Sequence, residues 1–276
     1  MAKKNWFLGI AALTLVFALV LAGCVSNMED EGDSKKTAIP LTFDTWADGY
    51  IAAADSDRSR TQWFNFTATA ATQFIFVSYS SLSNMYMQLY DSSDDEVGSE
   101  ENFWGSTGGV GFISRAVTSG AAYYIKVWPR SGSGTYRIGF TDFPKRPETP
   151  FTELTLNTWA NGYIAPEGSG APREQWFKFT ATAATQYIHA SYDSLTNLYA
   201  QLYDSGVYEV GSNANFWGST GGVESIPRAV TSGAMYYIKV WPHSGNGTYR
   251  IGFTTSTTPP LISSAALSTV VLPNAQ

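Results

Sequence analysis

The stretch "YYIKVWPRSGSGTYRIGFT", residues 123–141, carries the clearest structural signal in this chain of 276 residues. Apolar side chains alternate with others, Tyr123, Ile125 and Val127 against Tyr124, Lys126 and Trp128, which is the two-residue period of a β-strand. The segment "SGSG" at 131–134 has the glycines of a tight turn. The stretch therefore predicts a β-hairpin that joins "YYIKVW" to "TYRIGFT".

The same stretch returns at 236–254 with only two changes, His in place of Arg130 and Asn in place of Ser133. The match extends over 41–141 and 154–254 at a constant offset of 113, and about 70 of the 101 aligned positions are identical. A period of this length is the size of a whole domain and too long for a solenoid unit. The chain is therefore expected to contain two tandem copies of one domain.

Within a copy the sequence predicts strands throughout. "QWFNFTAT" and "NMYMQLYD" show the same alternation, are rich in aromatic residues, and are bounded by Gly, Ser, Asn and Asp. We count seven or eight strands per copy and no helix after the N-terminal segment. The predicted fold is all-β, with each copy a β-sandwich or jelly roll.

The N-terminus reads "MAKKNWFLGIAALTLVFALVLAGC". Two lysines precede an uncharged stretch that ends in small residues, which is the pattern of a secretory signal. A retained transmembrane helix is the alternative, because about 17 apolar residues is near the lower limit for spanning a bilayer. The ending "LAGC" at 21–24 resembles the lipobox of bacterial lipoproteins. This resemblance implies cleavage before Cys24, acylation of Cys24, and stable anchoring to the membrane through two or three acyl chains.

The remaining composition limits the domain plan and the partners. Cys24 is the only cysteine, so no disulfide within the chain is available to stabilise the domains. The net charge is −6 and the basic residues are scattered, which excludes a nucleic-acid footprint. The expected plan is a signal peptide at 1–23, an acidic flexible tether at 24–40, repeats at 41–141 and 154–254, a linker at 142–153, and a tail at 255–276 that lacks structure.

The strand motifs carry a further resemblance. "QWFNF", "MYMQLYDS", "VTSGAAYYIKV" and "GTYRIGF" resemble the bacterial pre-peptidase C-terminal domain, a β-sandwich that is similar to the collagen-binding domains of clostridial collagenases. The resemblance covers both copies. It departs from the family where Gln62 and Gln175 replace an acidic residue before the Trp.

The collagen-binding relatives bind calcium through clustered acidic residues, so an acidic loop of the first copy is a calcium candidate by resemblance. Asp91 and Glu96 recur in the second copy, whereas Asp94 and Asp95 do not. Calcium takes six or more oxygen ligands. The alternative is a solvated polar loop, and no other cofactor is expected.

The sequence contains no pattern that indicates catalysis. The only two histidines are His189 and His243, which stand where the first copy has Phe76 and Arg130, and both are expected at the surface. Neither has a sequence-level partner for nucleophilic catalysis. The linker and tail are also far shorter than a catalytic domain. The chain is therefore expected not to be an enzyme.

Aromatic residues on the polar side of the strands are the one positive indication of binding. If Lys126 and Gln88 face water, neighbouring tyrosines and tryptophans form a platform on which sugar rings could stack. The alternative is that loops such as "NFWG" at 102–105, which lacks an expected strand of its own, cover these rings. The candidate residues are Tyr86, Tyr90, Tyr124, Trp128, Tyr199, Tyr203, Tyr237 and Trp241.

These observations favour an exported, non-enzymatic protein anchored at the outer membrane or cell surface. Its expected partners are the membrane through Cys24, then polysaccharide, then extracellular protein. The rival hypothesis is a structural lipoprotein whose domains are spacers without a soluble ligand. The two hypotheses differ in whether the aromatic rings are accessible.

Overall fold

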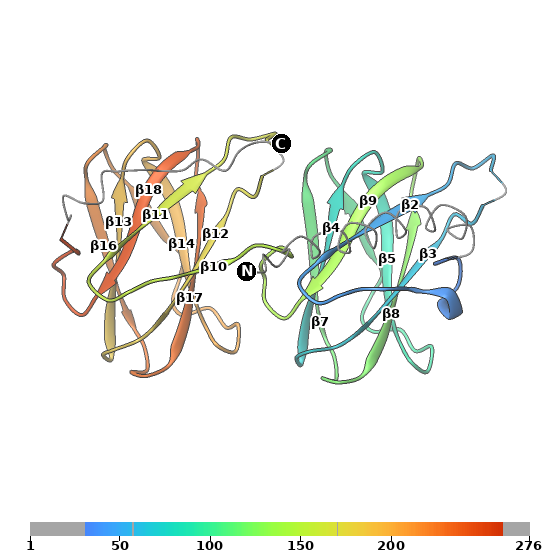
Figure 1. Ribbon diagram of the computed structural model, residues 1–276, viewed down its shortest axis with the longest axis horizontal. Helices are drawn as coiled ribbons and strands as arrows, with labels where there is room; N and C mark the ends of the chain where they lie inside the picture. Colours follow the sequence, from blue (N-terminus) through green and yellow to red (C-terminus); the bar gives the residue numbers. More distant parts are fainter. Residues whose placement is uncertain (1–30, 57, 170, 262–276) are drawn as a thin grey trace, which may run out of the picture. The chain divides into compact units, whose positions relative to one another are not determined.

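The computed structural model describes residues 31–56, 58–169 and 171–261 and divides the chain into two compact units, which we call domain 1 and domain 2. Domain 1 ends at Asp142 and domain 2 begins at Phe143. In Figure 1 the first runs from blue to green and the second from yellow-green to red. Each is a β-sandwich, which confirms the predicted all-β class with two tandem sandwiches.

Domain 1 consists of nine strands in two sheets. The five-stranded sheet has the order β1-β3-β8-β5-β6, and the four-stranded sheet has the order β2-β9-β4-β7. The strands are β1 (Ile39–Pro40), β2 (Trp46–Ile51), β3 (Gln62–Thr67), β4 (Thr72–Tyr79), β5 (Asn84–Asp91), β6 (Glu101–Trp104), β7 (Val110–Ala116), β8 (Ala122–Pro129) and β9 (Gly134–Thr141).

Domain 2 repeats this topology. Its sheets have the orders β10-β12-β17-β14-β15 and β11-β18-β13-β16. The strands are β10 (Phe151–Glu153), β11 (Trp159–Ile164), β12 (Gln175–Thr180), β13 (Thr185–Tyr192), β14 (Asn197–Asp204), β15 (Ala214–Trp217), β16 (Val223–Ala229), β17 (Met235–Pro242) and β18 (Gly247–Thr254).

The core of each domain lies between its two sheets. In domain 1, Ile125 and Val127 of β8 and Ile138 of β9 are completely buried, as the alternation in 123–141 predicts. Domain 2 buries Ile238, Val240 and Ile251 in the same way. Because the chain has one cysteine, this apolar packing is the main source of stability.

The predicted hairpin at 123–141 is wrong. β8 pairs with β3 and β5, whereas β9 pairs with β2 and β4, so the "SGSG" segment carries the chain from one sheet to the other. Gly132 and Gly134 have φ angles of 77° and 137°, which favour glycine and allow this sharp corner. Two strands that face each other across a core show the same alternation as two strands of a hairpin, so the pattern alone could not separate these arrangements.

The segments expected to be a flexible tether, a semi-rigid linker and an unstructured tail contain ordered contacts where the structure describes them. In the expected tether, Lys35–Thr37 form a 3-10 helix capped by Ser34, and β1 pairs in parallel with β3. In the expected linker, β10 pairs in parallel with β12. In the expected tail, the Trp159 Nε1–H donates to the carbonyl oxygen of Pro260 at 2.7 Å. Backbone pairing to an available sheet edge stabilises the first two segments despite their polar composition.

Candidate ligand-binding faces

Each five-stranded sheet has an outer side that points away from the core, and we call this side the aromatic face. All eight aromatic residues predicted from the sequence lie on these faces, on β5 and β8 of domain 1 and β14 and β17 of domain 2. Each of the eight is half-buried. The structure therefore brings them together in two sets, one per domain.

On domain 1 the exposed part of this face centres on two stacked rings. Tyr86 and Trp128 are cross-strand neighbours, with centroids 5.7 Å apart and ring planes at 29°. Lys126 places its Nζ atom 5.3 Å from the Trp128 ring and 5.7 Å from the Trp63 ring. A cation between two rings holds both in place by cation–π attraction.

Domain 2 repeats the arrangement with small differences. The rings of Tyr199 and Trp241 lie 5.4 Å apart at 31°, and His243 adds a third ring 5.1 Å from Tyr199. Lys239 lies over Trp241 and also forms an ion pair with Glu174 at 2.7 Å. In domain 1 the position of Glu174 is occupied by Thr61, so Lys126 has no matching ion pair among the described side chains.

Two further tryptophans, Trp104 and Trp217, extend the faces and were missed as candidates. They end β6 and β15, and their side chains are 77% and 74% exposed. Trp104 pairs with Asn84 and lies diagonal to Tyr86 on the same outer side. The expectation that "NFWG" is a loop covering the aromatic rings is wrong, because β6 is a strand at the sheet edge. In β6 the apolar Phe103 is buried and its neighbour Trp104 is exposed, and this alternation is the sequence signal that could have identified the strand.

Other candidates are covered by the chain itself. The Nζ atom of Lys35 lies 4.3 Å from the Tyr124 ring centroid. In domain 2, Phe143 and Phe151 cover Tyr237 with centroid distances of 4.4 and 4.8 Å. These contacts leave Tyr86, Trp128, Tyr199 and Trp241 as the more accessible predicted rings.

Tyr90 and Tyr203 pack against tryptophans, with centroids 5.5 Å from Trp63 and 5.4 Å from Trp176. Burial, followed by the charge of Glu209, raises the pKa of Tyr203 to about 12. Burial also raises the pKa of Tyr90. Both phenols therefore stay neutral at physiological pH and serve as hydrogen-bonding groups.

The condition that Gln88 faces water is not met. Gln88 is buried, and its Nε2 donates to the carbonyl oxygens of Leu89 and Gly98 at 3.0 Å each. Gln201 makes the same pair of contacts in domain 2. The loop after β5 therefore covers the middle of the strand, which divides the aromatic face.

Beside Trp241, domain 2 has a polar pocket of about 430 Å³. Trp241 forms one wall, and amide, hydroxyl, carboxylate and ammonium groups supply both donors and acceptors. The lining residues are Gln201, Tyr203, Glu209, Ser212, Asn213, Lys239 and Trp241. One aromatic wall with several hydrogen-bonding groups suits a sugar ring.

The four calcium candidates do not converge on a metal site. The Oδ1 atom of Asp91 accepts hydrogen bonds from the backbone N–H groups of Ser93 and Asp95, and Asp94 pairs with Lys35. Glu96 lies at an isolated bridge with Tyr90. Over the described ranges, no three His, Cys, Asp or Glu side chains are placed to bind one metal ion.

The expectation that both histidines lie at the surface is wrong for His189 and correct for His243. His189 is completely buried, and its Nε2 lies 2.9 Å from Oγ1 of Thr254. Burial lowers its pKa, and its Nδ1 has no hydrogen-bond partner in the structure. His189 lies on the outer side of β13 and is covered by the segment that follows β18. Because residues 255–276 were expected to lack structure, this burial could not be predicted from the sequence.

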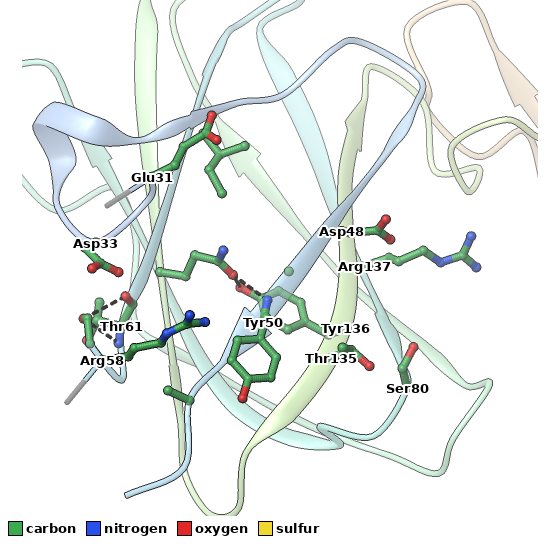
Figure 2. Close-up of a pocket in the computed structure, with 15 residues that line it drawn as sticks. Glu31, Asp33, Asp48, Tyr50, Arg58, Thr61, Ser80, Thr135, Tyr136 and Arg137 are labelled. Atoms are coloured by element: carbon green, nitrogen blue, oxygen red, sulfur yellow. Dashed lines mark hydrogen bonds between the residues drawn. The ribbon is translucent and has the colours of Figure 1, made fainter. Parts of the chain in front are cut away.

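Domain 1 also holds a pocket of about 640 Å³ that sequence analysis did not predict, which we call the Tyr50 pocket. Figure 2 shows Tyr50 and Tyr136 at its centre, Glu31, Asp33 and Arg58 at one end, and Asp48 and Arg137 at the other. Gln62 also lines the pocket, and its Oε1 accepts from the Tyr50 N–H at 2.9 Å and from the Tyr136 hydroxyl at 2.8 Å.

Gln175 makes the same two contacts in domain 2, with Tyr163 and Tyr249. The glutamine that departs from the family pattern therefore connects the two sheets in both domains.

The predictions for the N-terminus lie partly outside the residues that the structure describes. The signal peptide predicted at 1–23 and the acylation predicted at Cys24 both fall outside the described residues. Within the part of the chain that the structure describes, no helix is long and apolar enough to cross a membrane.

Comparisons with known proteins yield structural similarity only. No protein-family model matches the sequence, and no curated protein matches it. The pre-peptidase C-terminal domain of a collagenase from Bacillus anthracis matches 40% of this chain and 98% of its own, at 16% identity and a TM-score of 0.28.

Two other solved structures span more of the chain. A protein from Eubacterium rectale matches 91% of this chain and 85% of its own, at 10% identity and a TM-score of 0.32. Tandem CBM51 modules of a family 98 glycoside hydrolase from Streptococcus pneumoniae match 69% of this chain and 79% of their own, at 8% identity and a TM-score of 0.21. At such low values the function has to be argued from this chain's own residues.

Proposed function

We propose that this chain is an exported, lipid-anchored binding protein whose two β-sandwich domains recognise polysaccharide through their aromatic faces. The observation that carries the proposal is the recurrence of a stacked Tyr–Trp pair beside an exposed tryptophan. Domain 1 has Tyr86 and Trp128 next to Trp104, and domain 2 repeats all three. Leaving two tryptophans more than 70% exposed is unfavourable unless a partner covers them.

Polysaccharide fits this surface better than a folded protein partner. The C–H faces of pyranose rings stack on aromatic side chains, and neighbouring amides and charged groups bind the hydroxyls. The pocket beside Trp241 supplies such groups. Two weak sites on one chain also gain affinity by avidity when the ligand is a repeating polymer.

A glycan array probed with the full chain tests the proposal. Trp128→Ala combined with Trp241→Ala, and separately Trp104→Ala combined with Trp217→Ala, are expected to abolish binding. Tyr163→Ala is the matched control, because Tyr163 is a partly exposed aromatic residue on the four-stranded sheet. Binding that survives both double variants, or binding to no glycan, would refute the polysaccharide proposal.

The alternative function is a spacer without a soluble ligand. One specific observation favours it: Phe143 and Phe151 cover part of the domain 2 face, so some of its aromatic residues are simply core. A chain that binds no glycan while remaining folded and membrane-bound would support this alternative.

The lipid anchor is a separate part of the proposal and has its own test. Metabolic labelling with palmitate is expected to label the wild-type chain, and Cys24→Ser is expected to remove the label and release the protein from membranes. Label retained by the serine variant would contradict acylation at Cys24.

A further inference from the structure

The Tyr50 pocket has a base that both domains share and a rim that only domain 1 has. Gln62, Tyr50 and Tyr136 are repeated as Gln175, Tyr163 and Tyr249. Since these residues connect the two sheets in both copies, the base is explained by structure. Any function peculiar to domain 1 must come from the rim.

The rim of domain 1 carries three carboxylates, on Glu31, Asp33 and Asp48. All three residues are exposed, and none forms an ion pair with another described residue. In domain 2 the aligned counterpart of Asp48 is Asn161, and the residues at the same offset from Glu31 and Asp33, which precede the aligned repeat, are Pro144 and Arg146. Domain 2 has carboxylates elsewhere in this region, where Glu174 and Asp193 replace Thr61 and Ser80, but these are paired with Lys239 and Arg250.

Two arginines also line the pocket, and they do not cancel this charge. Arg137 lies with its guanidinium carbon 5.3 Å from the Trp46 ring, and Arg58 lies at the end marked by Asp33 in Figure 2. Counted together, the five charged side chains give the pocket a net charge of about −1 at pH 7. At the offset of 113, the lining positions of domain 2 carry Arg146, Arg250, Glu174 and Asp193, a net charge of about zero at pH 7.

The walls of the pocket suit an organic ligand better than a metal ion. Tyr50 is 49% exposed and offers a ring face, and Ile39 and Ala52 add apolar surface. The three carboxylates are not grouped closely enough to hold one metal ion. The volume of about 640 Å³ falls in the range typical of small-molecule sites.

We propose that the Tyr50 pocket binds a small organic cation, an amine carried on an apolar body, and that domain 2 has no such site. The ammonium group is placed at the end of the pocket where Glu31 and Asp33 lie, and the apolar body is placed against the face of the Tyr50 ring. This site lies in domain 1 only and is independent of the aromatic faces.

Titration of the full chain with phenethylamine, measured by calorimetry and by ligand-detected NMR, tests the proposal. The amine is expected to bind, and its affinity is expected to fall as salt is raised because the carboxylates are exposed. Phenethyl alcohol has the same ring without the charge and is expected to bind at least about tenfold more weakly, and phenylacetate is expected not to bind.

Variants locate the binding. Glu31→Gln combined with Asp33→Asn is expected to weaken phenethylamine binding by about tenfold, and Tyr50→Ala is expected to abolish it. Tyr163→Ala in domain 2 is the matched control and is expected to leave it unchanged. Both carboxylates of the double variant are exposed, so its melting temperature checks that the fold is retained. Absence of amine binding, equal binding of the alcohol, or loss of binding in Tyr163→Ala would overturn the proposal.

Discussion

The two domains share about 70% of their aligned residues yet differ in what covers the same tryptophan. In domain 2, Trp176 is 1% exposed because Phe143 packs against it at 5.1 Å and Phe151 lies nearby. In domain 1, Trp63 is only half-buried, and the segment before the sandwich contributes Lys35, which lies over the ring of Tyr124. The difference shows that the segment before each sandwich, which lies outside the aligned repeat, decides how much of the aromatic face is accessible.

The largest expected effect comes from truncating this tryptophan. Trp176→Ala is expected to lower the free energy of unfolding of domain 2 by about 3–5 kcal/mol, because it removes a fully buried ring. Trp63→Ala is expected to cost domain 1 about half of that or less. Hydrogen exchange, followed separately in peptides of each domain across a denaturant series, measures both. Equal losses would show that the covering segments do not distinguish the domains.

A second pair of substitutions tests a feature that the domains share. A Cβ at Gly49 would lie 2.3 Å from the Tyr136 ring, and a Cβ at Gly162 would lie 2.2 Å from the Tyr249 ring. Both tyrosines are buried and held by glutamine, so Gly49→Ala and Gly162→Ala are each expected to destabilise their own domain by about 2–3 kcal/mol. The same exchange measurement applies. A large effect in one domain only would contradict the equivalence of the two interiors.

A smaller, pH-dependent difference is expected from His189. Because burial lowers its pKa in the folded state, the unfolded chain binds the proton more readily, and domain 2 loses stability as pH falls below about 6.5. We expect the melting temperature of domain 2 to drop by a few degrees more than that of domain 1 between pH 7.5 and 5.

His189→Phe installs the residue found at the equivalent position of domain 1, Phe76, and is expected to remove this excess drop. A wild-type chain whose two domains respond identically to acid would refute the role of His189.

The smallest effect is expected from Lys35. Lys35→Ala removes the ion pair with Asp94, the hydrogen bond to the Asp91 carbonyl oxygen and the contact with Tyr124. It should cost domain 1 less than about 1 kcal/mol, because the Asp94 partner is exposed to solvent. Lys36→Ala, at an exposed neighbouring position, is the control, and equilibrium unfolding in urea compares the two. A loss as large as that of Trp176→Ala would mean that the polar segment of domain 1 covers its face as tightly as phenylalanine does in domain 2.

Sequence patterns predicted the strands and the buried set because alternation follows directly from the geometry of a strand. They could not assign β8 and β9 to different sheets, since partners across a core and partners within a sheet leave the same alternation. The short strands before each copy were not predicted, because β1 has two residues and β10 has three, too few for a detectable period.

The placement of the candidate aromatic residues could be predicted in part, for a related reason. The eight aromatic residues do lie on one side of each five-stranded sheet, as their spacing implies. Which of them are covered depends on Lys35, Phe143 and the loop above Gln88, and these contacts connect residues far apart in the chain. The Tyr50 pocket was not predicted because its acidic rim combines residues 31–33 with a strand that starts at Trp46.

The parallel pairing of β1 with β3 and of β10 with β12 also determines which segment must be duplicated when a chain of this kind gains another domain. Each sandwich is preceded by a short strand that completes its five-stranded sheet, so the modular unit is a leading segment plus a sandwich. Duplicating the full unit adds a domain whose sheet edge is already occupied. Inserting a bare sandwich would add one with an open edge, exposed to intermolecular strand pairing.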